Sequence, residues 1–123
     1  MNSAEKSKAL QNRLGELVIS VVNLTKKLSK NYQNEIFIRQ LIRCISSVGA
    51  NYTEAIFSYS RPDFTHNINI CKKEAAEAVY WLTLLMKVNP NYTSELEILK
   101  TETESLLKMF ISIVKTTQKN NKL

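Results

Sequence analysis

The strongest constraint on the fold is a run of apolar residues at three- and four-residue spacing in each of four long segments. Only two Gly and two Pro occur in the 123 residues, too few for a β-rich fold that turns every ten residues or so. The first segment predicts a helix over about residues 6–30, and its apolar face consists of Leu10, Leu14, Leu17, Val18, Val21, Leu24 and Leu28. The pattern therefore predicts an all-α chain.

Three turn signals separate the four predicted helices. Asn31-Tyr32-Gln33-Asn34 ends the first helix, and Ser60-Arg61-Pro62-Asp63 predicts an N-cap with proline in the first turn. Asn89-Pro90 ends the third helix, because the residue before a proline avoids helical geometry. Ser94-Glu95-Leu96-Glu97 predicts a capping box at the start of the last helix. The helices after the first are expected at about residues 35–59, 62–88 and 94–119.

Four helices of about 25 residues joined by short connections predict one domain over residues 1–123, an up-down-up-down four-helix bundle. No segment has the ~20 continuous apolar residues of a membrane span, and the first residues lack the apolar core of a signal peptide. We therefore expect a cytoplasmic protein with no membrane partner. Cys44 and Cys71 are expected to be reduced thiols in or near the core.

Three motifs carry a resemblance to a known family. They are Ser47-Val48-Gly49-Ala50-Asn51-Tyr52-Thr53-Glu54-Ala55, then Pro62-Asp63-Phe64, then Lys72-Lys73-Glu74-Ala75-Ala76-Glu77-Ala78-Val79-Tyr80-Trp81-Leu82. In order and spacing they resemble the bacterial 23S ribosomal RNA intervening-sequence proteins, and the last helix is similar to the closing helix of that family. The resemblance implies an antiparallel, left-handed four-helix bundle, often a ring-like homopentamer, with no assigned activity for most members. A related branch serves diversity-generating retroelements, which implies RNA or DNA and a reverse transcriptase or another protein as partners.

The third helix is apolar nearly all the way round between Ala78 and Met86. A helix with one solvent-exposed face would carry charges every third or fourth residue, so this stretch predicts a second buried face. The alternative is a core that wraps widely around the helix. The residues expected to include contacts with another subunit are Val79, Tyr80, Leu84 and Met86.

The charge distribution points to an anionic partner. The chain has 17 basic and 11 acidic residues, a net charge of +6. The last helix carries a lysine stripe opposite its apolar face, and the first turn brings a second basic cluster together. The candidate nucleic-acid-binding residues of the two groups are Lys108, Lys115, Lys119 and Lys122, and Lys26, Lys27, Lys30, Arg39 and Arg43. The alternative is that lysines near helix C-termini offset the helix dipole and maintain solubility.

The segment from Ser47 to Ala55 interrupts the second helix with small and polar residues. We expect it to form a polar seam with the third helix, in which Gly49 allows close approach, so that Leu at this position would disrupt folding. The predicted seam consists of Ser47, Gly49, Asn51, Glu54, Glu74 and Glu77. The alternative is a ligand or metal pocket.

Catalytic and metal-binding motifs are weak. Di-metal bundles use two Glu-x-x-His elements, whereas this chain has one histidine, His66, preceded three residues earlier by Asp63. We therefore expect no metal, no cofactor and no enzymatic activity. The sequence favours a self-associating helical bundle that binds nucleic acid or a ribonucleoprotein through basic outer faces, and the alternative is a protein-interaction scaffold without a nucleic-acid role.

Overall fold

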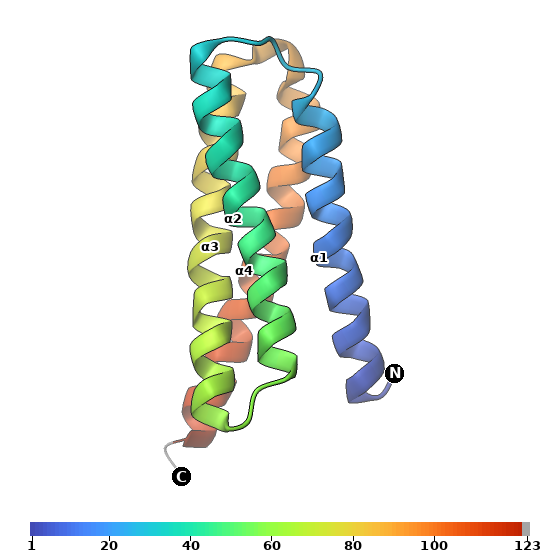
Figure 1. The fold of residues 1–123 in the computed structure, drawn as a ribbon, viewed down its shortest axis with the longest axis vertical. Helices are drawn as coiled ribbons and strands as arrows, with labels where there is room; N and C mark the ends of the chain where they lie inside the picture. The colour runs from blue at the N-terminus through green and yellow to red at the C-terminus, as the bar shows by residue number, and fades with distance from the viewer. Residues whose placement is uncertain (122–123) are drawn as a thin grey trace.

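The computed structural model describes residues 1–121, with side chains as far as Lys119. Four helices, α1 to α4, run side by side in alternating directions (Figure 1). A short 3₁₀ turn, η1, precedes α4. The elements are α1 Ser3–Thr25, α2 Tyr32–Ile56, α3 Arg61–Val88, η1 Pro90–Tyr92 and α4 Thr93–Asn121. The predicted all-α, up-down-up-down four-helix bundle is confirmed, and its left-handedness stays a prediction.

Side-chain caps explain where the first three helices begin. The Asn2 side chain accepts a hydrogen bond from the Glu5 amide at 2.8 Å, so α1 starts earlier than the apolar pattern predicts. Asn31 caps α2 in the same way. Ser60 accepts from the Asp63 amide at 3.2 Å, which confirms the predicted N-cap of α3.

The predicted capping box at the start of α4 is wrong. The fourth helix begins at Thr93, directly after η1, so Ser94 already lies inside the helix. The Thr93 hydroxyl donates to the Pro90 carbonyl at 2.9 Å instead. The 3₁₀ turn that follows Asn89 starts the chain on a helical path before Ser94 is reached, which leaves Ser94 no capping position.

The core lies between the four helices and is built from the apolar faces that the sequence predicts. Phe110 of α4 and Leu41 of α2 are completely buried, as are Ile68 and Leu82 of α3. Burying a side chain of this size contributes about 1.5–3 kcal/mol relative to its exposure. The apolar packing is therefore sufficient to hold helices that would be marginal alone.

A pair of buried amides ties the helix connections together at the end of the bundle where α1 ends. The Asn34 side chain donates to Asn89 Oδ1 at 3.0 Å, and the Asn89 side chain donates to Asn34 Oδ1 at 2.8 Å. Their remaining amide hydrogens bond the carbonyls of Ser29 and Leu85. Buried polar groups without partners are costly, so the complete pairing fixes this end of the bundle.

Both cysteines are free and buried, as predicted. Burial raises the pKa of the Cys44 thiol and of the Cys71 thiol to about 12. Both therefore stay protonated at neutral pH. Among residues 1–121, none of the helices combines the length and the apolar character that a membrane crossing requires.

Candidate nucleic-acid interface

A shallow groove of about 500 Å³ runs between α3 and α4 and has lysines on its rim. Lys72 and Lys73 come from α3 and Lys115 comes from α4. Its floor is apolar and includes Leu107 and Ile111. A positive rim over an apolar floor suits the aliphatic stems of lysine, which cover the floor while their ammonium groups reach solvent.

Two further lysines of α4 extend this positive surface. Lys108 and Lys119 are exposed, seven residues before Lys115 and four residues after it, so they lie about two turns and one turn away along the same helix. We call the combined surface the lysine face; it consists of Lys72, Lys73, Lys108, Lys115 and Lys119. None of the ion pairs among the described side chains involves these five residues. Lys122, the other predicted residue of the stripe, lies outside the described residues.

Lys72 and Lys73 were not predicted as binding residues. The sequence shows two adjacent lysines on the third helix. It also predicts that this helix runs antiparallel to the last one. The proximity of Lys72 and Lys115 can be predicted only when the register between α3 and α4 is known. That register is set by core packing. The structure therefore adds a second helix to the predicted stripe.

The second predicted cluster divides in the structure. Lys26, Lys27 and Lys30 are exposed at the end of α1, and Arg39 is exposed on α2. Arg43 is different, because its guanidinium is paired with Glu74 at 3.1 Å and with Glu77. Binding of phosphate by Arg43 would therefore have to compete with these two carboxylates, and its role in nucleic-acid binding stays a prediction.

Arg43 belongs to a polar cluster between α2 and α3. The Glu77 carboxylate accepts hydrogen bonds from Trp81 Nε1 at 2.9 Å and from Cys44 Sγ at 3.0 Å, in addition to its pairing with Arg43. These contacts, the bond from Trp81 foremost, hold the pKa of Glu77 below its ordinary value. The carboxylate therefore stays charged to a lower pH than an isolated glutamate does.

The same cluster is a candidate metal site by distance. Ligand atoms of Cys44, Glu74 and Glu77 lie within 4.8 Å of one another. A metal would compete with the Arg43 guanidinium, which already neutralises the carboxylates. It would also need the Cys44 thiolate, whose formation is opposed by a pKa of about 12. The chemistry of the cluster therefore favours a structural ion-pair network between α2 and α3.

The predicted polar seam forms only in part. The Asn51 side chain donates to the carbonyl and hydroxyl oxygens of Ser47, 2.8 and 3.0 Å away, so both residues satisfy each other within α2. Glu54 is exposed. Contact with Glu74 and Glu77 comes instead from Arg43 and Cys44, which lie earlier on α2 than the predicted seam residues.

Gly49 does not face α3, and the prediction of a close approach there is wrong. A Cβ built at Gly49 would meet the Leu14 Cβ of α1 at 3.9 Å, an ordinary van der Waals distance. Gly49 and Ala50 instead line a groove of about 900 Å³ between α1 and α2, together with Gly15 and Val18. Small side chains on both helices leave this groove open. Its only charged lining residue is Glu16.

The four predicted interface residues point in different directions. Tyr80 is 55% exposed, and its ring lies 5.0 Å from that of Trp81. Met86 packs against the core. Val79 and Leu84 are half-buried. At about 100° per residue, Tyr80 and Leu84 share the outer side of α3, so these two form the outward part of the predicted interface.

Comparisons with known proteins agree with this architecture. The sequence model of the 23S rRNA-intervening sequence protein family matches residues 6–112. The chain is also similar to the crystal structure of a protein of unknown function from the S23 ribosomal protein family of Bacteroides thetaiotaomicron. Identity to that protein is 32%, the TM-score is 0.76, and the match covers 85% of this chain and 97% of the other. None of the curated proteins compared with the chain matches it.

Proposed function

The chain belongs to the 23S rRNA-intervening sequence protein family, and we propose that it is a non-enzymatic, self-associating cytoplasmic bundle that binds nucleic acid or a ribonucleoprotein. The lysine face would contact the phosphate backbone. Lysines attract phosphates without reading bases, so the binding is expected to be salt-dependent and weakly selective for sequence. RNA and DNA are both candidate partners.

The observation that carries this proposal is the groove between α3 and α4. Two helices place Lys72, Lys73 and Lys115 around one depression, where a phosphate backbone can meet cations from both sides. Lys108 and Lys119 lengthen the positive surface along α4. A net charge of +6 adds long-range attraction that would raise the rate of encounter with an anionic polymer.

Self-association is proposed on separate grounds. Tyr80 and Leu84 place apolar surface on the outer side of α3, beside the lysine face. Large exposed apolar side chains in groups are typical of interaction surfaces. A ring of copies, the pentamer that the family resemblance implies, would repeat the lysine face and increase the affinity for a long polymer by avidity.

The test is a titration of fluorescein-labelled RNA and DNA followed by fluorescence anisotropy at increasing salt. We expect binding that falls steeply with salt and is lost in a variant with Lys108→Glu, Lys115→Glu and Lys119→Glu. A control variant with two charge reversals at exposed positions of α1, Lys6→Glu and Lys8→Glu, should bind nearly as well as wild type. Absence of binding to RNA and DNA at low salt would overturn the proposal.

The alternative function is a protein-interaction scaffold, which the outward Tyr80 favours. A reverse transcriptase or another protein would then bind the bundle directly. This alternative predicts a partner that is recovered with the protein after nuclease treatment and is lost on Tyr80→Ser. Recovery that depends on intact nucleic acid would instead support the lysine face.

A further inference from the structure

The turn between α2 and α3 presents two aromatic rings to solvent. Phe57 is 75% exposed and Tyr59 is 101% exposed. Ile56, directly before them, is 36% exposed. Side chains this exposed add little apolar burial to the bundle core. A group of exposed apolar side chains is typical of an interaction surface.

The backbone of this turn is held in place while the rings point outward. Ser58, between the two aromatics, is half-buried, and its hydroxyl donates to the Glu54 carbonyl at 3.3 Å. The Asn67 side chain of α3 donates to the same hydroxyl at 3.4 Å. The amides of Phe57 and Ser58 bond carbonyls of the last turn of α2. The two rings therefore project from a constrained segment and lose little freedom on binding.

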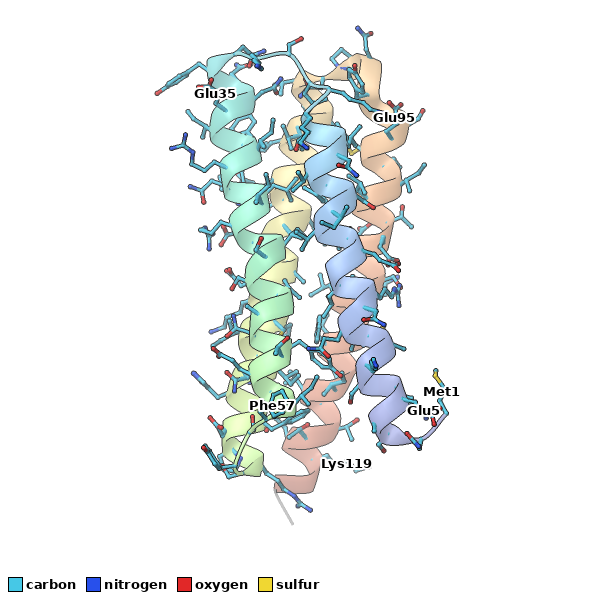
Figure 2. The ribbon with its side chains drawn as sticks, turned by 45° about the vertical axis from the view of Figure 1, so that its right-hand side comes forward. Met1, Glu5, Glu35, Phe57, Glu95 and Lys119 are labelled. Carbon is cyan, nitrogen blue, oxygen red and sulfur yellow. The ribbon has the colours of Figure 1, made fainter. Side chains whose placement is uncertain are left out.

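Cations lie at the same end of the bundle. Figure 2 labels Phe57 and Lys119 at this end, where α4 finishes beside the turn. Arg61, also exposed, lies two residues after Tyr59. The acids of this segment are Glu54 and Asp63, so the positive charge near the turn comes mainly from α4.

We infer that the turn is a base-stacking platform for single-stranded nucleic acid whose backbone follows the lysine face; this rests on the proposed function. Exposed aromatics at the end of a basic surface are a combination that binds single strands, because every unpaired base offers a face for stacking. In a duplex the base faces are already stacked on each other, so the rings of Phe57 and Tyr59 would add nothing. Single strands are therefore the expected partner class.

The experiment compares wild type with a variant that carries Phe57→Ser and Tyr59→Ser. The probes are fluorescein-labelled oligo(dT) and oligo(U) of ~20 nucleotides and a DNA duplex of the same length, a size that exceeds a typical single-strand site. Each lost stacking contact should reduce single-strand affinity at least about fivefold, whereas duplex affinity should change less than about twofold. Tyr32→Ser, at an exposed tyrosine on the far end of the bundle, is the matched control and should bind like wild type.

Four results would overturn the inference. Equal loss of single-strand and duplex affinity in the double variant would show that the turn acts through folding, which thermal unfolding would check. Unchanged single-strand affinity, with a changed oligomeric mass by light scattering, would assign the rings to a protein contact. If the wild type binds the duplex and the single strands equally well, the stacking role fails while the proposed function stands. Binding to none of the probes would remove both.

Discussion

The groove between α1 and α2 and the groove between α3 and α4 differ in size and in chemistry. The groove between α1 and α2 is the larger, about 900 Å³ against about 500 Å³, yet its only charged lining residue is Glu16. The groove between α3 and α4 has three lysines on its rim. A hollow formed by small side chains is a consequence of helix packing, whereas clustered cations supply a reason for a ligand to bind. The smaller groove is therefore the better functional candidate.

The difference follows from the residues that each helix pair contributes. Gly15 and Gly49 remove side-chain volume where α1 faces α2, and a Cβ added at Gly15 would meet nothing within 4 Å. In the groove between α3 and α4, the larger side chains of Leu107 and Ile111 occupy the floor, and the three lysines surround it.

The largest effect is expected from charge reversal on the α3–α4 groove. Lys72→Glu with Lys115→Glu should lower nucleic-acid affinity about tenfold or more, because two attractive contacts become repulsive. Thermal stability should stay nearly unchanged, since neither side chain forms an ion pair that these changes would break. Ser20→Glu with Ser46→Glu places the same number of carboxylates at the α1–α2 groove and should have little effect. Anisotropy titrations of the two variants give the comparison.

A second prediction compares a larger side chain at a buried position between α2 and α3 with a larger side chain in the groove between α1 and α2. Cys71 is completely buried and its Sγ lies 3.4 Å from the Val48 carbonyl, so Cys71→Leu should reduce the free energy of unfolding by about 1–3 kcal/mol. Gly49→Leu should leave it unchanged or raise it by up to about 1 kcal/mol, because leucine favours a helix interior over glycine and the new side chain enters the groove. Denaturant unfolding measures both. An equal loss in the Gly49 variant would show that α1 packs tightly against α2.

A third prediction concerns the attachment of α1 to α4. Arg13 forms two bonds to Glu102, at 2.6 and 2.7 Å, and the hydrogen bond from Arg13 lowers the pKa of Glu102. Both side chains are about one-third exposed, 36% and 34%, so Arg13→Ala should cost only about 0.5–1 kcal/mol at neutral pH.

The same pair predicts a pH dependence. A carboxyl whose pKa is lowered in the folded state adds stability above its ordinary pKa of 4.5, and this stability is lost as pH falls through the folded value. The difference between wild type and Arg13→Ala should therefore be largest above 4.5 and shrink below it. A difference that grows with acid would contradict the assignment.

A small effect of the opposite sign is expected at Gly15. Gly15→Ala adds a methyl group to open space on α1 and should stabilise the protein by about 0.5–1 kcal/mol, since Ala favours the helix and restricts the unfolded chain. Unfolding curves would show the gain as a higher midpoint. A loss of stability would mean that α1 lies closer to its neighbours than the groove indicates.

The sequence predicts the elements of the fold well and their contacts less well. The four helices and the Ser60 cap follow from apolar periodicity and local hydrogen bonding, which nearby residues determine. Gly49 was assigned to the wrong neighbour because periodicity states which residues share a face but not which helix that face meets. Its α1 contact depends on how α1 is placed against α2.

The site shows the same limit. The lysine stripe of α4 lies on one helix and is visible in its spacing, whereas Lys72 and Lys73 join it through tertiary register. The sequence does not show that Arg43 is ion-paired, because Glu74 and Glu77 lie on another helix and reach it only in the folded bundle. The buried pair of Asn34 and Asn89 has no sequence signature, because its 55-residue separation is closed only by the bundle.

The most direct test of the lysine face is the salt dependence of single-strand binding in a variant that carries Lys72→Ala and Lys115→Ala. Each lysine that contacts a phosphate adds about 0.7 to the magnitude of the slope of log K against log salt concentration on a single strand. The account predicts a slope that is smaller in magnitude than that of wild type by about 1.4, with unchanged thermal stability. A slope equal to that of wild type would contradict it.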